Sequence, residues 1–183
     1  MKRTISILLV FFSLAVTTYA VDFRIEARVH YFQPTEQSFR DIYGGGPQFA
    51  GEISVGLLDG LEIWLGGSYF SKKGKSTFTQ EEIKIWIVPF GGGLKYWIMI
   101  GSFNLYAGLG IQHFQYKETN LLGEGDITEG KIGYVGKLGS IMDLVKGLVL
   151  VTSIEYSTCK IEFADFKYDV GGLSFGIGLG FEF

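Results

Sequence analysis

The stretch L-S-F-G-I-G-L-G-F-E-F, from Leu173 to Phe183, closes the chain with a strict alternation of side chains. One face carries the apolar residues Leu173, Phe175, Ile177, Leu179, Phe181 and Phe183; the other carries Ser174, Gly176, Gly178, Gly180 and Glu182. A repeat of two residues is the period of a β-strand, and no helix separates residues in this way. We therefore predict a final strand with one apolar face and one face of small or polar residues.

The segment from Val21 to Gln33 alternates as strictly as the final one. Its apolar face carries Val21, Phe23, Ile25, Ala27, Val29 and Tyr31, and its polar face carries Asp22, Arg24, Glu26, Arg28 and His30. Pro34 ends this predicted strand because proline cannot donate a hydrogen bond to a neighbouring strand. The chain thus begins and ends its folded part on strands of the same kind.

Six further segments alternate between these two, at about residues 48–57, 61–71, 83–96, 103–116, 131–142 and 148–160. The connections are alternately long and short, and the first and last are long: residues 34–47, 72–82, 117–130 and 161–169 against the short turns near residues 58–60, 99–102 and 143–147. Eight strands of about ten residues joined in this way predict an all-β, eight-stranded antiparallel up-and-down barrel of a height that crosses one bilayer.

The fourth predicted strand has the least regular pattern. Ile83, Ile85 and Ile87 alternate with Lys84, Trp86 and Val88, and we assign the isoleucines to the apolar face and Lys84 to the polar face. Pro89 and the glycines at residues 91–93 then interrupt the pattern. Since both residue types mark bulges, the facing of Lys95 and Tyr96 is left open.

Composition narrows the class of protein. The net charge is -3, which gives no electrostatic basis for binding nucleic acid. Cys159 is the single cysteine, so no disulfide can form within the chain.

Residues 1–20 carry Lys2 and Arg3, an apolar run and a small residue at Ala20, which is typical of a secretory signal peptide; retention as an anchor is the alternative. Residues 21–183 then form one barrel domain.

Alternation alone does not say whether the apolar face points into a soluble, lipocalin-like barrel or out into lipid. The polar faces carry charges of both signs mixed with glycine, which suits the narrow interior of an eight-stranded barrel. The predicted interior set is Asp22, Arg24, Glu26, Arg28, His30, Glu52, Glu62, Lys84, Lys137, Glu155 and Glu182. Aromatic residues near strand ends predict a girdle at the membrane interface: Tyr31, Phe32, Tyr69, Phe70, Phe114, Tyr116, Tyr156 and Phe163. We therefore predict a transmembrane barrel.

By strand number, loop asymmetry and its terminal strand, the mature chain resembles the small bacterial outer-membrane barrels related to the transmembrane domain of outer-membrane protein A, to OmpX and to OmpW. It departs from outer-membrane protein A in that we expect no carboxy-terminal peptidoglycan-binding domain. The resemblance implies location in the outer membrane, contact with its lipid and lipopolysaccharide, and no cofactor. It also implies that the barrel-assembly machinery reads Phe175, Ile177, Leu179, Phe181 and Phe183 as an assembly signal.

The interior charges have two interpretations, a structural plug of salt bridges or a polar pathway, and we favour the plug. Pairing across the turn predicts that Lys137 lies near Glu155, and closure of the barrel predicts that Glu182 lies near Arg24. Lys72, Lys73 and Lys75 form a basic segment that is either a solvated loop or a contact for lipopolysaccharide.

Catalytic chemistry has little support in the sequence. His30 and His113 are the only histidines, and neither has the spacing of a Ser-His-acid set. The glycine runs at 44–46 and 91–93 lack a strand-to-helix context for phosphate binding, and Cys159 is expected to be a packing residue. We expect a monomeric, non-enzymatic barrel with a structural or interaction role through its external loops. A narrow channel for small apolar solutes, like OmpW, and a lipid A-modifying enzyme are the alternatives.

Overall fold

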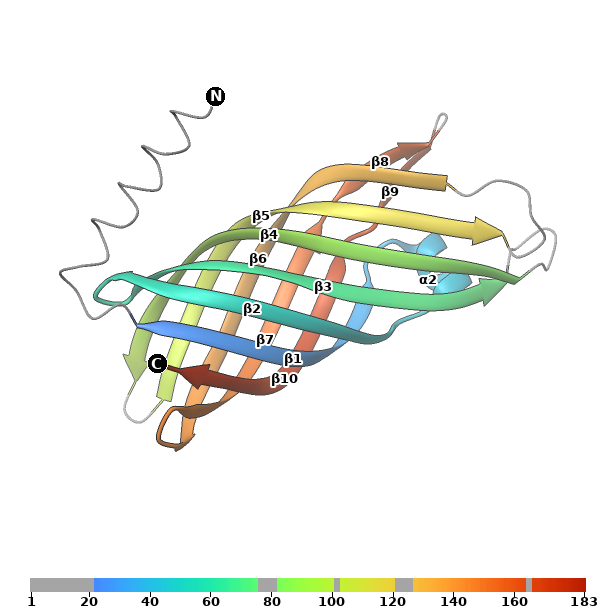
Figure 1. Ribbon diagram of the computed structural model, residues 1–183. Coiled ribbons are helices and arrows are strands. Elements are labelled where there is room, and N and C mark those ends of the chain that lie inside the picture. Colours follow the sequence, from blue (N-terminus) through green and yellow to red (C-terminus); the bar gives the residue numbers. More distant parts are fainter. Residues whose placement is uncertain (1–21, 76–81, 101–102, 121–126, 164–165) are drawn as a thin grey trace, which may run out of the picture.

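A computed structural model describes residues 22–75, 82–100, 103–120, 127–163 and 166–183 of the chain. The predicted signal peptide, residues 1–20, lies outside the described residues. The described part is dominated by strands that run the length of a barrel (Figure 1).

The eight long strands close into one barrel in the order β1-β10-β7-β6-β5-β4-β3-β2, and every neighbouring pair is antiparallel. Their bounds are β1 Phe23–Pro34, β2 Gly46–Leu58, β3 Leu61–Lys75, β4 Glu82–Ile100, β5 Phe103–Asn120, β6 Ile127–Val145, β7 Leu148–Thr158 and β10 Gly172–Glu182. Barrel strands that follow one another along the chain lie side by side, and the first and last of them, β1 and β10, pair to close the barrel. The predicted eight-stranded up-and-down barrel is confirmed.

Closure depends on the pairing of the first strand with the last. β1 pairs with β10 from Arg24 opposite Glu182 to Pro34 opposite Gly172, and the backbone N–H of Phe183 donates to the carbonyl of Phe23 at 2.9 Å. The backbones approach closely here: a Cβ on Gly178 would lie 2.1 Å from the carbonyl oxygen of Ala27. Glycine is therefore required at Gly178 to bring the two strands into register.

Three strands are much longer than the ten residues expected. β4, β5 and β6 contain 19, 18 and 19 residues, whereas β1 and β2 contain 12 and 13. The additional residues extend the barrel on the side of the long connections (Figure 1). A strand that continues beyond the membrane keeps its alternation, so the sequence pattern alone does not mark where the membrane ends.

Three short elements lie largely within segments that the sequence predicted to be loops. The helix α2, Gln37–Tyr43, follows β1, and the strands β8, Lys160–Phe163, and β9, Phe166–Asp169, form a hairpin before β10. The helix is too short to have a distinct repeat pattern, and its apolar side chains Phe39 and Tyr43 are buried by contact with the barrel end. Among the described residues, no helix is long and apolar enough to cross a membrane.

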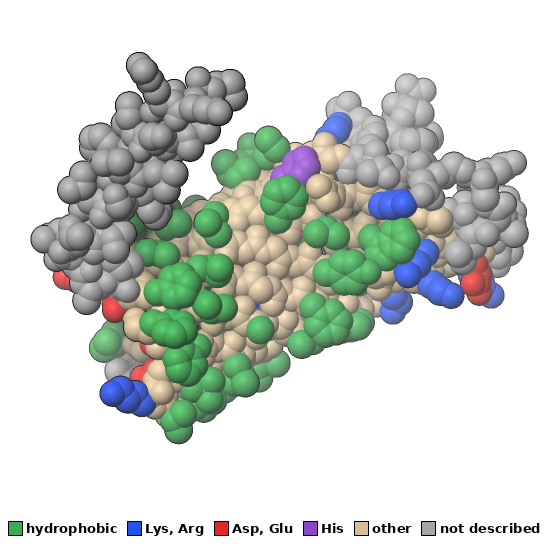
Figure 2. Space-filling view, in the orientation of Figure 1, with side chains coloured by type: hydrophobic (Ala, Val, Ile, Leu, Met, Phe, Trp, Pro, Cys, Tyr) green, Lys and Arg blue, Asp and Glu red, His purple; other side chains and the backbone are tan. Residues whose placement is uncertain are grey.

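The outside of the barrel is apolar over a broad band. Side chains such as Phe49, Leu65, Leu109 and Ile177 are 57–75% exposed although they are large and hydrophobic. Figure 2 shows such side chains spread over the visible barrel wall, while basic side chains gather beyond them at one end. An exposed apolar surface of this extent is the lipid-contacting surface of a transmembrane barrel.

The facing of β4 differs from the expectation. Ile83, Ile85 and Ile87 are buried in the interior, and Lys84 lies on the outside. The alternation continues through Pro89 without a change of phase, so Lys95 also faces inward. What changes at Pro89 is the barrel interior: beyond it the inward-facing residues of β4 are apolar, so an apolar face no longer means a lipid-facing one.

Candidate functional site

The interior nearest the short turns is filled by an ionic network. Its members are the cations Arg24, Arg28, Lys95 and Lys137 and the carboxylates of Glu26, Glu52, Glu62, Glu155 and Glu182. They come from β1, β2, β3, β4, β6, β7 and β10. Because these strands lie all around the barrel, the network ties opposite walls together across the lumen. We refer to it as the interior ionic network.

Arg24 holds the outer layer of this network, nearest the chain ends. Its guanidinium donates to Glu26 Oε1 at 2.8 Å, to Glu62 Oε2 at 2.6 Å and to Glu182 Oε1 at 2.9 Å. The three carboxylates belong to β1, β3 and β10, so one planar cation joins three strands.

Glu52 is the centre of the next layer. Its carboxylate accepts from Lys95 Nζ at 2.5 Å, from Lys137 Nζ at 2.6 Å and from Arg28 Nη2 at 2.9 Å. Arg28 also lies 3.1 Å from Glu155, and Lys137 lies 3.6 Å from the same carboxylate, its cross-strand neighbour. The side chains of Lys95 and Glu52 are 0% and 1% exposed. Buried charges in this arrangement are tolerated because each has an opposite charge within contact.

Aromatic rings fill the space that the ionic network leaves. Lys137 Nζ lies 3.6 Å from the ring centroid of Trp64, and Arg24 lies over the ring of Trp97 at 4.7 Å. Trp64 and Tyr106 are 0% and 2% exposed. Beside these rings, Ile141, Val149 and Val151 form a small apolar cluster that Trp97 contacts. Side chains therefore occupy the lumen from the short turns to the middle of the barrel.

A layer of neutral polar groups follows. Ser153 and His30 Nε2 are 3.3 Å apart, and Gln48 accepts from Ser174 at 3.1 Å and donates to Ser68 at 3.0 Å. A Cβ on Gly176 would lie 1.9 Å from the His30 ring, so glycine provides the space for this histidine. His30 is thus an interior hydrogen-bonding residue.

The half of the interior nearest the long connections is apolar. Its buried cluster consists of Phe32, Phe39, Tyr43, Phe70, Ile83, Ile85, Ile87, Phe114, Cys159, Ile161 and Val170, and we call it the upper apolar core. Phe32 and Phe70 meet edge to face with centroids 4.9 Å apart. The helix α2 contributes Phe39 and Tyr43, so it closes this end of the barrel.

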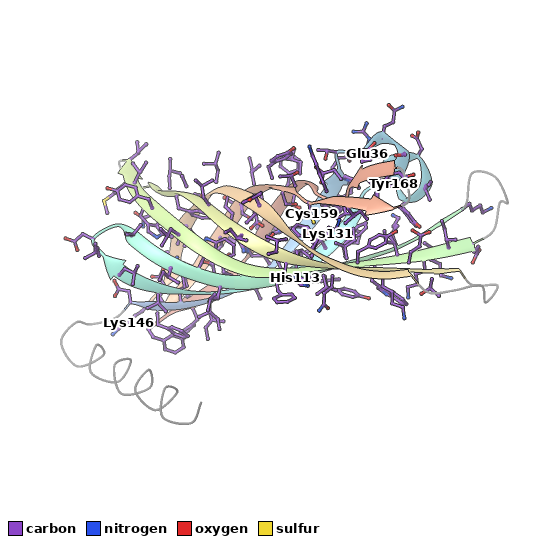
Figure 3. All side chains as sticks on the ribbon, turned by 90° about the horizontal axis from the view of Figure 1, so that it is seen from above. Glu36, His113, Lys131, Lys146, Cys159 and Tyr168 are labelled. Atoms are coloured by element: carbon purple, nitrogen blue, oxygen red, sulfur yellow. The ribbon has the colours of Figure 1, made fainter. Side chains whose placement is uncertain are left out.

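Two titratable groups of the upper apolar core lie outside the membrane-spanning segments. Burial, together with nearby Asp169, raises the pKa of the Cys159 thiol to about 11. Burial, together with nearby Glu118, also raises the pKa of Tyr43. Both side chains are therefore neutral at physiological pH, and Cys159 serves as a small packing residue beside Lys131 (Figure 3).

Several sequence predictions about facing are corrected. Lys84 is not an interior residue, and Asp22 is exposed at the rim rather than enclosed in the ionic network. Lys95, whose facing the sequence left open, is fully buried in it. Phe32, Phe70 and Phe114 were expected in the outer girdle but lie in the upper apolar core, whereas Tyr31, Tyr69 and Tyr156 are exposed on the outside. The side chain of Phe163 lies outside the described residues.

The other residues that the sequence singled out lie apart from one another and form no common site. His113 lies on the outside, edge to face with Phe90 at 5.2 Å, and Figure 3 shows its ring pointing away from the barrel. Lys72 faces inward and donates to the carbonyl of Gly45 at 3.0 Å, while Lys73 and Lys75 are exposed. Phe175, Ile177, Leu179, Phe181 and Phe183 line the outside of β10 and are 45–70% exposed. In the part of the chain that the structure describes, no cluster of side chains has the composition of a metal site.

The hydrogen-bonded ladder between β3 and β4 has one interruption. Gly67 pairs with Phe90 and Phe70 with Ile87, but Ser68 and Tyr69 have no partner in β4, and the register is the same on both sides of this gap. The opposite residues are Val88 and Pro89. Proline has no N–H, and the carbonyl of Pro89 points toward Gly67 of β3; because the N and C=O of one strand residue point to the same side, the missing donor faces β3.

Comparison with known proteins supports the fold and goes no further. No protein-family model and no curated protein matches the sequence. The chain is similar in structure to OprG from Pseudomonas aeruginosa, with a TM-score of 0.67, 16% identity, and coverage of 90% of this chain and 96% of that one. It is also similar to outer membrane protein W of Escherichia coli, with a TM-score of 0.57, 16% identity, and coverage of 91% of this chain and 100% of that one. For neisserial surface protein A the TM-score is 0.57 and the identity 16%, with coverage of 88% of this chain and 97% of that one. These are small outer-membrane barrels.

Proposed function

Starting from a transmembrane barrel of the outer-membrane type, we propose that this protein does not conduct ions and acts through the surface it presents outside the membrane. The observation that carries this proposal is the filled lumen. The interior ionic network closes the half nearest the short turns, and the upper apolar core closes the other half. Ions would have to break buried ion pairs and then cross an apolar layer, and both steps are costly.

The interior ionic network has a structural role in this proposal. Arg24 joins β1 to β3 and β10, and Glu52 joins β2 to β1, β4 and β6. These bonds cross the lumen, so they hold the barrel at one diameter and register. A rigid barrel supports the elements above it: the long ends of β4, β5 and β6, the helix α2 and the β8–β9 hairpin (Figure 1).

Planar-bilayer recording of the purified full chain tests this proposal. We expect no steady single-channel currents, because the network and the apolar core leave no continuous wet path. Protein refolding is monitored in parallel by heat-modifiable migration on a gel, so that absence of current is measured on folded barrels. Large, steady currents from the folded protein would refute the filled lumen.

A second candidate function is the passage of small apolar solutes, as in a narrow channel of the OmpW type. The interruption at Pro89 favours it, because it opens the β3–β4 ladder beside the upper apolar core. A solute that entered this core from outside would not need to cross the interior ionic network. It would leave sideways into the bilayer between Tyr69 and Val88.

A reversible crosslink tests lateral passage. Cysteines replacing Tyr69 and Val88, in a Cys159→Ser background, would join β3 to β4 where the ladder is open. If solutes pass here, oxidation lowers uptake of a fluorescent apolar solute into proteoliposomes, and reduction restores it. The matched control replaces Phe49 and Tyr69, which already face each other in the intact β2–β3 ladder. Equal uptake by the oxidised and reduced forms would exclude lateral passage at Pro89.

We propose no catalytic role. His113 contacts Phe90 on the outside of the barrel, and His30 is enclosed beside Ser153 among interior groups that water does not reach. A histidine that acts as a general base on a lipid bond needs a nucleophile and an orienting acid beside it and access to that bond. Neither histidine has this combination. Lipid A extracted from cells that express this protein should therefore have an unchanged mass. A mass shift that His113→Ala abolished would show the opposite.

A further inference from the structure

Basic residues replace apolar ones at one level on the outside of three neighbouring strands. Along β4 the outward positions are apolar or glycine from Ile98 to Trp86, and the next outward residue is Lys84. The register places Lys73 of β3 directly opposite Lys84, and Lys117 of β5 opposite Trp86. These four side chains therefore lie together on one face of the sheet.

The two lysines nearest the indole flank it. Lys84 Nζ lies 4.6 Å and Lys117 Nζ lies 5.6 Å from the ring centroid of Trp86. The ring holds both ammonium groups near one another, so their charges act at one place. Lys73 adds a third charge with a side chain that is 67% exposed, and Glu82, 3.9 Å away, is the carboxylate beside it. The cluster keeps an excess of positive charge.

The cluster lies at the level of lipid headgroups. Trp86 is four residues beyond the exposed ring of Phe90, which corresponds to about 10 Å of height for a strand tilted as in membrane barrels. Tryptophan is typical of the membrane interface. Lys84, the next outward residue beyond Trp86, meets the charged groups of that layer. Figure 2 shows basic side chains gathered at this end, beyond the apolar band.

On β1, β2 and β10, the described outward residues that end the apolar band are not basic: they are Gln33, Pro47 and Leu173. Lys160, at the start of β8, is an exposed lysine apart from the cluster. A general attraction to an anionic surface would not require three lysines together on neighbouring strands around one indole. The arrangement instead suits a bound group with more than one negative charge.

We propose that Lys73, Lys84 and Lys117, arranged around Trp86, bind the phosphate groups of a glycolipid of the outer leaflet, namely the lipid A part of lipopolysaccharide. Lysine binds phosphate as a point charge, and two ammonium groups beside one indole match a phosphorylated sugar whose acyl chains continue along the apolar wall below. This site is independent of whether the lumen conducts.

Titration of the purified full chain in detergent with bisphosphorylated lipid A tests the site. Trp86 is an outward-facing tryptophan, whereas Trp64 and Trp97 contact interior cations, so the fluorescence change should disappear in Trp86→Phe. Binding of the lysine variants is measured by native mass spectrometry. We expect Lys84→Gln and Lys73→Gln each to weaken binding about fivefold, the effect of one lysine near an anionic membrane surface.

Two exposed lysines elsewhere provide matched controls. Lys160→Gln on β8 and Lys146→Gln at the short β6–β7 turn should leave the affinity unchanged. Lipid A without phosphates should bind more weakly, and neither phosphatidylglycerol micelles nor inorganic phosphate should compete. Equal binding of dephosphorylated lipid A, equal competition by phosphatidylglycerol, or unchanged affinity of the Lys73→Gln/Lys84→Gln double variant would each overturn the proposal.

Discussion

Glu52 is the residue on which the interior ionic network converges. Three cations from β1, β4 and β6 contact its carboxylate, and its side chain is 1% exposed. Removal of this one negative charge leaves Arg28, Lys95 and Lys137 facing each other without their common partner. Buried ion pairs differ in this respect from surface pairs, whose charges water can solvate after the partner is lost.

We therefore expect Glu52→Gln to lower the free energy of unfolding by about 3–5 kcal/mol. The matched control is Glu182→Gln: that side chain is 40% exposed and, among the described residues, forms its salt bridge with Arg24, so the cost should remain below about 1 kcal/mol. Urea unfolding in lipid vesicles, followed by heat-modifiable migration, measures both. Equal losses for the two variants would mean that the network contributes no more than a surface ion pair.

The close approach of β1 and β10 at Gly178 gives a second prediction at the scale of single residues. Its Cβ would lie 2.1 Å from the Ala27 carbonyl oxygen and 2.6 Å from Arg28 Cγ, so Gly178→Ala forces β1 and β10 apart. Overpacking of this kind costs about 1–3 kcal/mol, and Gly178→Leu should cost more. At Gly136 an added Cβ meets only Leu109, at 3.7 Å, so Gly136→Ala is the control. The same unfolding measurement should separate the two alanine variants, and equal stability would contradict the close approach.

At the scale of elements, β4 determines how the barrel relates to the membrane. On the side of the short turns its inward residue Lys95 is charged and its outward residue Leu94 is apolar. Beyond Pro89 the inward residue Ile85 is apolar and the outward residue Lys84 is basic. The strand keeps one phase throughout: its inner face becomes apolar beyond Pro89, and its outer face becomes basic at Lys84.

This exchange explains which predictions from the sequence succeeded. The strand number, the antiparallel order and the facing of Arg24, Glu52 and Lys137 follow from a period of two with glycine on the polar face. The facing of Lys84 and Phe70 was wrong because the barrel interior is itself apolar beyond Pro89, so apolar residues there do not mark the lipid-facing side. Residues 37–43 were missed as a helix because seven residues are too few for a helical repeat, and burial under the barrel end stabilises them instead.

The final strand carries a prediction about assembly. Phe183 packs against Phe23 and Phe181, with ring centroids 5.8 and 5.0 Å apart, and its N–H donates to β1. Deletion of Phe183 removes both the aromatic terminus and this closing bond, so we expect less folded barrel in the outer membrane. Immunoblotting of heat-modifiable protein in membrane fractions measures the yield, with Lys146→Gln as the control at the same end of the barrel. A normal yield would show that the terminal residue has no part in assembly.

At the scale of the whole molecule, the barrel has three interior layers and two exterior zones. From the short turns outward the interior changes from the ionic network, with the small apolar cluster beside it at Trp97, to the neutral polar layer and the upper apolar core. The exterior changes from an apolar band to basic residues around Trp86. Closure of the lumen by two chemically different fillings is the basis of the proposed non-conducting role.

The rate at which a water-soluble thiol reagent modifies cysteines at positions 84 and 85 tests this account most directly. In a Cys159→Ser background, a cysteine replacing Lys84 lies outside the barrel above the apolar band, and one replacing Ile85 lies within the upper apolar core. We predict rapid modification at position 84, and modification at position 85 only after the protein is unfolded. Equal, rapid modification at both positions in the folded protein would mean that water fills the upper barrel, and it would contradict the closed lumen.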